Sequence, residues 1–283
     1  MIRIIAILGG LFFAVAAFWA LGVGAYTAMT VETEETVEHE FYVHPKDVSF
    51  SSDGPLGTYD RAQLQRGLKV YQEVCAACHG MKFVAFRDLG ALGYTEPEVA
   101  AIASQFQVPG VDPTTGEPVL RPAVATDYMV GPYPNDIAAA AANNNAIPPD
   151  LSLMTKARHD GSAYVYSLLS GYGPIPAELK AAYPDFETPQ GLYFNQYFHN
   201  LNIAMAPPLT AAGQVTYSDG TDATISQMSK DVTAFMTWSA EPKLEQRRQT
   251  GFVFIGFLIF ATILAYMSKK QVWAGAKPKK RKD

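Results

Sequence analysis

The chain has 283 residues, of which 48% are hydrophobic and 17% charged, against a usual charged share of about 25%, so the composition excludes a disordered protein and favours contact with a membrane. Two cysteines are too few for a disulfide-stapled scaffold or a four-cysteine zinc site. Residues 269–283 carry a net charge of +6 in a chain of net charge −5, which leaves an acidic body that argues against nucleic-acid binding and for a basic partner.

The first predicted element is an uncharged apolar segment from Ile4 to Met29. It exceeds the roughly 20 residues that a helix needs to cross the hydrocarbon core of a membrane. A cleaved signal peptide is the competing interpretation, because Val23-Gly24-Ala25 suits a cleavage site. Residues 1–30 are therefore an anchor or a signal, and both interpretations place the acidic run from Glu32 to Glu40 outside the cytoplasm.

Residues 31–245 are expected to form the globular domain, whose first helix follows Asp60. This residue suits the N-cap position, and Leu64, Leu68 and Tyr71 recur at helical spacing. The apolar stripe of this helix leads directly to Cys75.

Further helices, loops and a small hairpin are predicted in the rest of the domain. Helices are expected over 97–106, 136–143 and 162–169, whereas the Gly- and Pro-rich segments 108–134 and 171–205 favour loops. Asp219-Gly220 favours a small hairpin over 217–221. Thr224 and Gln227 have the spacing of a capping box at the start of a last helix, whose apolar face carries Met228, Val232, Phe235 and Trp238.

A second apolar block, Gly251 to Met267, predicts a transmembrane helix over residues 246–270. The tail, residues 271–283, contains the densest basic cluster, Lys277 to Lys282. Since positive residues collect on the cytoplasmic side of a membrane, the tail is expected inside and the globular domain outside, in an oxidising compartment.

The most informative motif is Cys75-Ala76-Ala77-Cys78-His79. Two thiols three positions apart at a helix end can each add to a vinyl group of one porphyrin, and the adjacent histidine then reaches the iron. Three alternatives stay open: a thioredoxin-type dithiol, a zinc site with two further ligands, and a chance occurrence of the pattern.

The sixth ligand of such an iron has several candidates. Met81 lies too near His79 in the sequence to reach the opposite haem face, while Met129, Met154, His159 and His199 remain possible. Met205 is favoured, because Pro207-Pro208 stiffens its loop. A histidine and methionine pair raises the reduction potential and leaves no position for a substrate, which argues against catalysis at the haem.

In this order, the motifs resemble those of the cytochrome c1 family, the haem subunits of cytochrome bc1 complexes, from about Tyr59 to Lys270. The matching stretches are CAACHGMKF (Cys75 to Phe83), AANNNAIPPDLS (Ala141 to Ser152), KARHDGSAYVYSLLSGY (Lys156 to Tyr172), GLYFNQYF (Gly191 to Phe198), NIAMAPPL (Asn202 to Leu209) and TISQMSKDVTAFMTWSAEP (Thr224 to Pro242). A lone CxxCH motif is shared by many cytochromes, whereas this series is specific.

The resemblance implies a mostly helical, cytochrome c-like haem domain with long loop insertions and a C-terminal transmembrane helix. The family usually has a cleaved leader, whereas the N-terminal apolar segment of this sequence suits a possible second transmembrane helix. It implies one covalently attached haem c, with Cys75 and Cys78 as attachment residues and His79 and Met205 as axial ligands. The family residues that line the haem match Asn143, Pro149, Arg158 and Tyr164. The guanidinium of Arg158 could also pair with a buried haem propionate. Asn143 and Tyr164 could equally well be packing and capping residues as haem contacts.

The function implied by the resemblance is that of an electron carrier without substrate turnover of its own. It would pass single electrons from the iron–sulfur protein to a soluble cytochrome c, in a complex that also contains cytochrome b and is expected to be dimeric. Its place would be a bacterial inner membrane, with the haem domain periplasmic and the C-terminus cytoplasmic. Two rival functions stay open: a subunit of another membrane-bound haem enzyme, such as a dehydrogenase or peroxidase, and a haem-free redox switch.

One departure concerns the loops. Some bacterial relatives have an extra cysteine pair that forms a disulfide there, and this sequence has none. Packing or hydrogen bonds are therefore expected to brace the segment 171–205.

Overall fold

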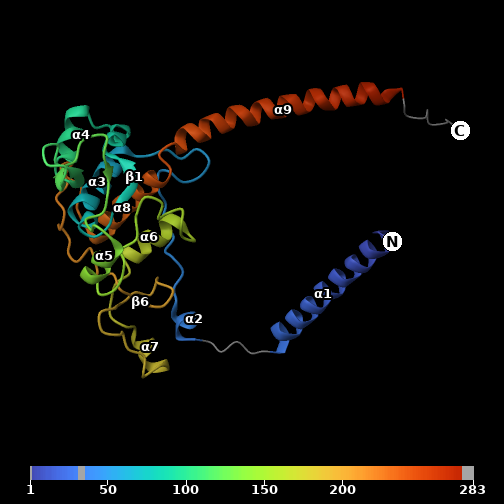
Figure 1. Ribbon diagram of the computed structural model, residues 1–283, viewed down its shortest axis with the longest axis horizontal. Helices are drawn as coiled ribbons and strands as arrows, with labels where there is room; N and C mark the ends of the chain where they lie inside the picture. The colour runs from blue at the N-terminus through green and yellow to red at the C-terminus, as the bar shows by residue number, and fades with distance from the viewer. Residues whose placement is uncertain (1, 31–35, 276–283) are drawn as a thin grey trace. The chain divides into compact units, whose positions relative to one another are not determined.

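Helices are the main regular structure in the part of the chain that the computed structural model describes, residues 2–30 and 36–275 (Figure 1). The chain divides into two units, Met1–Phe41 and Tyr42–Asp283. The first unit contains the long helix α1 (Ile2–Thr30) and the short helix α2 (Val37–Phe41). α1 is long and apolar enough to cross a membrane and buries none of its residues. The beginning of the acidic run, residues 32–35, lies outside the described residues.

Within the described residues, the second unit combines helices with three two-stranded antiparallel sheets, β1 with β4, β2 with β3 and β5 with β6. Its helices are α3 (Arg61–Glu73), η1 (Cys75–Ala77), η2 (Phe86–Leu92), α4 (Glu96–Ala103), α5 (Asp136–Ala142), α6 (Gly161–Leu169), α7 (Ala177–Ala182), α8 (Ile225–Ala240) and α9 (Leu244–Ala274). Its strands are β1 (Met81–Ala85), β2 (Gln107–Val111), β3 (Pro118–Pro122), β4 (Tyr128–Met129), β5 (Tyr193–Phe194) and β6 (Asn202–Ile203). The predicted mostly helical class is confirmed, and α4, α5 and α6 lie where helices are predicted.

Helices α3 and α8 begin at the predicted capping residues. The Asp60 side chain accepts a hydrogen bond from the Gln63 amide at 3.2 Å, and the Thr224 side chain accepts one from the Gln227 amide at 3.1 Å. The capping box is incomplete, because the Gln227 side chain donates to Asp231 at 2.8 Å instead of returning to the N-cap. Each cap satisfies an amide that the helix itself leaves unpaired.

The two helices pack against each other at the centre of the second unit (Figure 1). The predicted apolar face of α8, which carries Phe235, is fully buried, and the Tyr71 ring of α3 lies 5.8 Å from the Phe235 ring between centroids. A Cβ on Gly67 of α3 would overlap the backbone of Asp231, so only glycine allows this close crossing. The crossing fixes the direction in which α3 presents the residues that follow it.

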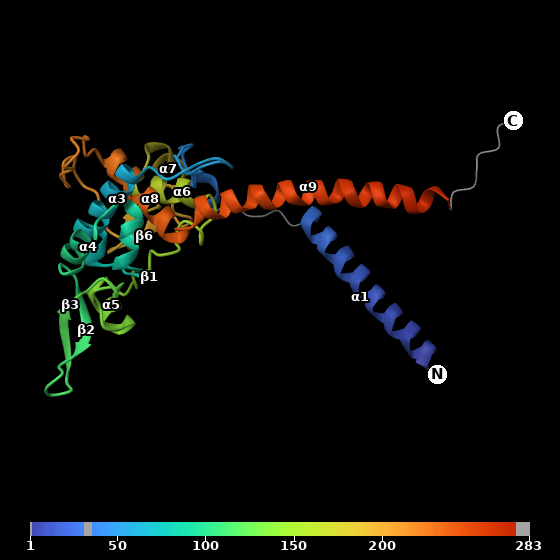
Figure 2. The ribbon, with the colours of Figure 1, turned by 90° about the horizontal axis from the view of Figure 1, so that it is seen from above.

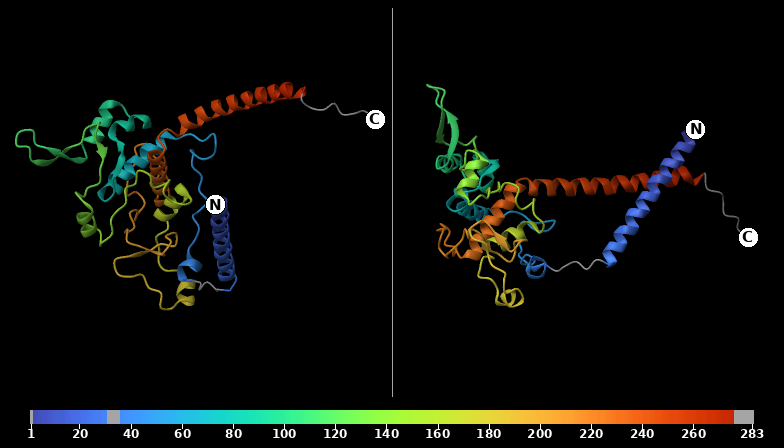
Figure 3. Two further views of the ribbon diagram at one scale, coloured as in Figure 1. Left: turned by 45° about the vertical axis from the view of Figure 1, so that its right-hand side comes forward. Right: turned by 60° about the horizontal axis from the view of Figure 1, so that its bottom comes forward.

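The segment 108–134, predicted as loop, contains the β2–β3 hairpin, so that prediction is wrong. The hairpin pairs Val108 with Arg121 and Gly110 with Val119, and it projects from the rest of the second unit (Figures 2 and 3). Prolines lack a backbone donor, but they are tolerated in strands with a free edge. Pro109, Pro118 and Pro122 are therefore as compatible with a two-stranded ribbon that has free edges as they are with a loop.

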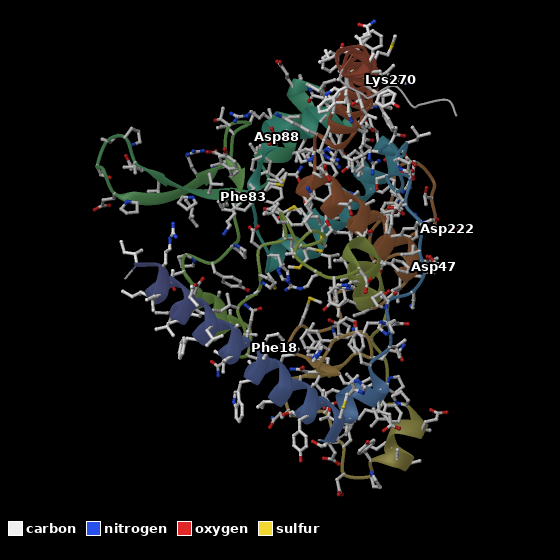
Figure 4. All side chains as sticks on the ribbon, turned by 90° about the vertical axis from the view of Figure 1, so that its right-hand side faces the viewer. Phe18, Asp47, Phe83, Asp88, Asp222 and Lys270 are labelled. Carbon is white, nitrogen blue, oxygen red and sulfur yellow. The ribbon has the colours of Figure 1, made fainter. Side chains whose placement is uncertain are left out.

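Strand β1 directly follows the CxxCH motif and pairs with β4, where Met81 opposes Met129. Both methionines are fully buried, whereas Phe83 is exposed (labelled in Figure 4). The strand continues into η2, whose Asp88 accepts a hydrogen bond from the Ala85 amide at 3.0 Å (Figure 4). These contacts connect the segment after the motif to the hydrophobic core.

The segment 171–205 is largely irregular, as predicted, apart from α7 and the short β5–β6 pair. Its central brace is Asn195, which has no exposed surface. The Asn195 side chain donates to the Leu168 carbonyl at 2.8 Å and accepts from the Tyr197 amide at 3.0 Å, and its own amide donates to the Leu201 carbonyl at 2.7 Å. Hydrogen bonds to a buried amide thus hold these loops.

The small hairpin predicted over 217–221 is absent from the described structure, so this prediction is wrong too. Asp219 instead forms a side-chain turn, in which its Oδ1 accepts from the Thr221 amide at 3.0 Å. Its Oδ2 binds Arg66 of α3 at 2.6 Å. The Asp-Gly pair is therefore used as a turn without flanking strands.

Helix α9 is a long apolar helix that extends away from the other elements of the second unit (Figure 1), and its side chains project around its axis (Figure 4). It is long and apolar enough to span a membrane. Its first residue, Leu244, is buried in the domain, and Tyr59 holds the joint: its amide donates to Glu245 at 2.7 Å and its hydroxyl to the Glu241 carbonyl at 2.9 Å. Residues 276–283 of the basic tail lie outside the described residues.

Candidate functional site

The CxxCH motif forms a tight turn at the end of α3. Cys75 begins the 3₁₀ turn η1, and its carbonyl accepts hydrogen bonds from the amides of Cys78 at 3.1 Å and His79 at 2.9 Å. Both cysteines are partly exposed and neither is in a disulfide. The local hydrogen bonds therefore bring two free thiols and one imidazole onto a single turn.

The His79 ring is oriented by a residue that is far away in the sequence. Its Nδ1 lies 2.7 Å from the carbonyl oxygen of Pro149. A carbonyl only accepts, so Nδ1 carries the proton and Nε2 keeps its lone pair. Burial lowers the pKa of His79, although the Pro149 carbonyl and the Asp150 carboxylate act in the opposite direction. The ring is thus neutral above its lowered pKa and presents Nε2 as a metal ligand.

The backbone around His79 is held from two sides. The Tyr71 hydroxyl of α3 donates to the His79 carbonyl at 3.2 Å, and the Gly80 carbonyl accepts from the Leu151 amide at 2.9 Å. A Cβ on Gly80 would overlap the backbone of Gly131, so this position needs glycine. The imidazole is consequently fixed through both its ring and its main chain.

The Cys75 thiol is in an environment that disfavours a thiolate. Burial raises its pKa to about 12, and the neighbouring Cys78 acts in the same direction. A dithiol that exchanges disulfides needs a lowered pKa, because the thiolate is the nucleophile. This environment argues against the thioredoxin-type interpretation of the motif.

Met205 lies two residues after β6 and is half-buried against the hydrophobic core. Its carbonyl oxygen accepts a hydrogen bond from the Tyr172 hydroxyl at 3.0 Å. On its C-terminal side, the Pro208 carbonyl accepts from the Gln214 side chain at 2.8 Å. The loop that carries the thioether is therefore held at the methionine and three residues after it.

The other candidates for a sixth ligand lie in different surroundings. Met129 is fully buried in the core opposite Met81, and Met154 packs against the same core. The His159 side chain is 98% exposed and lies 3.1 Å from Asp160, so it has the surroundings of a surface residue. His199 likewise has its Nδ1 at 2.9 Å from the neighbouring Asn200 side chain.

Three predicted site residues remain: Arg158, Tyr164 and Asn143. Arg158 is exposed, donates to the Ala157 carbonyl at 3.1 Å, and lies close enough to Tyr164 to counteract the rise in the pKa of that hydroxyl that burial causes. Asn143 forms the C-terminal cap of α5 and donates to the Ala139 carbonyl of the same helix at 2.7 Å. Of the predicted set, the structure thus brings together His79 with Pro149 and Arg158 with Tyr164.

Three residues that hold the backbone of the site in place are not predicted from the sequence: Tyr71, Tyr172 and Asn195. Each makes a hydrogen bond to a backbone carbonyl distant in the sequence or in another element. Tyr71 belongs to the apolar stripe of α3, and the other two lie inside stretches that match the family. Neither the apolar stripe nor the match to the family indicates which carbonyl each side chain binds.

The donors present fit a covalently attached haem. The motif supplies two thiols for attachment and an imidazole whose Nε2 is available, and Met205 supplies a half-buried thioether on a fixed loop. Within the residues that the structure describes, no cluster of three or more His, Cys, Asp and Glu side chains is suited to a metal ion, so a zinc site finds no further ligands there.

Comparison with known proteins agrees with this chemistry. The model of the Cytochrome C1 family matches residues 50–276. "Cytochrome c1, heme protein, mitochondrial" of Saccharomyces cerevisiae is 42% identical over 253 residues, which cover 89% of this chain and 79% of that protein. "Cytochrome c1" of Rhodospirillum rubrum is 41% identical over 244 residues, which cover 83% and 89% respectively.

A third relative is longer. "Cytochrome b/c1" of Bradyrhizobium diazoefficiens is 43% identical over 245 residues, which cover 81% of this chain and 36% of that protein. The chain therefore spans about a third of the length of this relative.

Proposed function

Because the chain belongs to the cytochrome c1 family, we propose that it is the haem subunit of a bacterial quinol–cytochrome c reductase. One haem c, bound through thioether bonds to Cys75 and Cys78, would supply one-electron redox chemistry. The observation that carries this proposal is the hydrogen bond from His79 Nδ1 to the Pro149 carbonyl, which prepares Nε2 as a ligand. The chain would carry electrons and turn over no substrate of its own.

The roles of the individual side chains follow from their positions. His79 and Met205 are the proposed axial ligands, and with both of them bound the iron would have no position left for a substrate. Arg158 is proposed to pair with a haem propionate, since its guanidinium is exposed and oriented beside Tyr164. Asn143, Pro149 and Tyr164 are proposed to line the haem. These residues all lie within the proposed haem domain, residues 31–245.

The proposed partners follow from charge and from the relatives. Residues 1–268 carry a net charge of −11, which suits a basic, soluble cytochrome c as electron acceptor. The iron–sulfur protein and cytochrome b of the same dimeric complex are the proposed donor and neighbour. The name of the Bradyrhizobium relative, "Cytochrome b/c1", supports the association with cytochrome b.

The proposed location is a bacterial inner membrane with the haem domain on the periplasmic side. Helix α9 has the length and composition of a membrane span. Seven Lys or Arg residues lie between Lys269 and Lys282, so the positive-inside rule places this end in the cytoplasm. Residues 246–270 are the proposed span and residues 271–283 the cytoplasmic tail.

A gel stained for haem after denaturation tests covalent attachment. The full chain should keep its stain, and the double variant Cys75→Ala, Cys78→Ala should lose it, because alanine forms no thioether. Ser226→Ala, a change outside the motif, is the control and should keep the stain. A colourless wild-type band would contradict the proposal and favour the haem-free redox switch.

Purification from detergent-solubilised membranes tests the assignment to a complex. The chain should copurify with b-type haems and an iron–sulfur centre, and the preparation should oxidise a quinol and reduce a basic cytochrome c. Copurification with a different set of cofactors, together with rapid cyanide binding at the haem, would indicate a subunit of another haem enzyme.

A further inference from the structure

A tyrosine from another part of the segment 171–205 holds the backbone of Met205. The Tyr172 hydroxyl donates to the Met205 carbonyl at 3.0 Å. Tyr172 lies three residues after the end of α6, and Met205 lies two residues after β6. The bond therefore joins the two ends of a long irregular segment at the position of the proposed thioether ligand.

Tyr172 is itself fixed to the helical core. It forms an antiparallel bridge with Asn195, which is completely buried. The Asn195 side chain donates to the Leu168 carbonyl in the last turn of α6 at 2.8 Å. Since α6 packs against α8, the phenol is connected through α6 to the helical core of the domain.

The hydroxyl of Tyr172 remains a hydrogen-bond donor at neutral pH. A phenol is protonated at neutral pH, because its ordinary pKa is about 10. A protonated phenol donates one hydrogen bond, and here that bond goes to the Met205 carbonyl.

A methionine ligand depends more than most ligands do on a backbone that is held in place. Its side chain has three rotatable bonds and its thioether binds iron weakly, so the position of the main chain determines how often the sulfur lies within reach. Pro207 and Pro208 restrict the backbone after Met205, and Tyr172 fixes the carbonyl of Met205 itself.

We propose that Tyr172 is a positioning residue that holds the Met205 loop so that its thioether stays on the haem iron. This inference rests on the proposed function, because it takes Met205 as the axial ligand. Tyr172 acts through the Met205 backbone, so the expected consequence of losing its hydroxyl is a larger fraction of molecules in which the methionine has left the iron.

The test uses the full haem-loaded chain in detergent and the variant Tyr172→Phe, which removes the hydroxyl and keeps the ring. Loss of one neutral hydrogen bond should raise the methionine-free fraction by about two- to tenfold. The midpoint potential should fall, the long-wavelength band of the oxidised protein that reports methionine ligation should weaken, and carbon monoxide should bind to more of the reduced protein.

Tyr166→Phe is the matched control. Tyr166 lies on α6, and its hydroxyl forms a 2.8 Å hydrogen bond with the exposed Ser226 side chain. This variant loses a hydroxyl of the same kind from the same region, so it should leave the potential, the band and carbon monoxide binding unchanged. A thermal melt of both variants separates a general loss of stability from a change at the iron.

The outcomes distinguish this inference from the proposed function. If the wild type shows the methionine band and Tyr172→Phe keeps the wild-type potential, band and carbon monoxide binding, the positioning role is overturned and the ligand assignment stands. If the wild type lacks the band, the ligand assignment is wrong and the positioning role falls with it.

Discussion

At the scale of single residues, the site depends on side chains that bind backbone carbonyls. His79 binds the Pro149 carbonyl, Tyr71 binds the His79 carbonyl and Tyr172 binds the Met205 carbonyl. Each bond fixes a proposed ligand without using the atom that the iron needs. The ligands can thus be held in place before the metal is bound, which lowers the entropy lost on binding.

Replacing Met205 with leucine should leave the haem attached and lower its midpoint potential. Leucine has a similar volume but no thioether, so the proposed sixth ligand is lost while packing is largely kept. Axial ligands tune haem potentials over about 0.8 V, and a fall on the order of 0.1 V or more is expected. A redox titration of the purified chain measures it.

Met154→Leu is the control for this substitution, because Met154 packs against the core. Its midpoint potential should match that of the wild type. If Met154→Leu lowered the potential and Met205→Leu did not, the sixth ligand would have to be reassigned to Met154.

The sequence predicts the chemistry of the site better than its geometry. The CxxCH motif and the stiff loop after Met205 are local patterns, and they lead directly to the proposed donors. The contact between His79 and Pro149 joins residues 70 positions apart, and its acceptor is a main-chain oxygen that any residue would provide. No pattern of residue types indicates such a bond, which is why Pro149 is predicted only as part of the pocket wall.

At the scale of elements, a buried carboxylate fastens α8 to α3. Asp231 has no exposed surface, and its oxygens accept from Gln63 at 3.1 Å, Arg66 at 3.0 Å and Gln227 at 2.8 Å. Arg66 also binds Asp219 at 2.6 Å. A buried charge with this many partners is stable only as a set, so removal of one member leaves the others poorly paired.

Replacing Asp231 with alanine should destabilise the protein by about 3–5 kcal/mol, because Arg66, Gln63 and Gln227 then lose the buried acceptor that they share and the partly buried Arg66 charge has one partner fewer. Denaturant unfolding of the full chain in detergent, followed by tryptophan fluorescence, measures the loss. Asp219→Ala removes the exposed end of the same network and should cost about 1 kcal/mol or less. Equal losses for the two variants would contradict the importance of burial.

The same elements explain which parts of the fold the sequence predicts. Asp60 and Thr224 act locally, and both caps lie where the sequence predicts them. The Gln227 side chain instead donates to Asp231, one turn further along the same helix, so the capping box does not form. The β2–β3 hairpin is missed because its prolines and glycine suit an edge ribbon and a loop alike.

At the scale of the whole molecule, charge is separated along the chain. Residues 1–268 carry a net charge of −11 and the last 15 residues a net charge of +6. A negative surface raises the local concentration of a basic carrier and speeds its association. The proposed electron transfer should therefore depend on ionic strength.

The rate of electron transfer to a basic cytochrome c should fall as salt is raised through about 0.1 M, where the Debye length shortens to about 10 Å. Stopped-flow measurements over a salt series check this. An uncharged small-molecule acceptor is the control and should show little salt dependence. A flat profile with the basic cytochrome c would refute electrostatic steering.

The joint between the domain and α9 should be rigid. Tyr59 binds both Glu245 and the Glu241 carbonyl, Arg248 donates to the Gly57 carbonyl at 2.6 Å, and Arg247 pairs with Glu241. Tyr59→Phe combined with Glu245→Ala, which together remove both bonds, should broaden the distribution of haem orientations in oriented membranes, as measured by electron paramagnetic resonance. The midpoint potential should stay constant. An unchanged distribution would contradict a role of these bonds in rigidity.

Helix α9 begins with a residue that is buried in the domain, so it does not act as a flexible linker between the domain and the membrane. With α9 across the bilayer as proposed, the haem edge would keep one height above the lipid surface and one heading, and any tilt of the helix would be passed on to the whole domain. The distance between successive redox centres would then have to be closed by the molecules that deliver and collect the electrons.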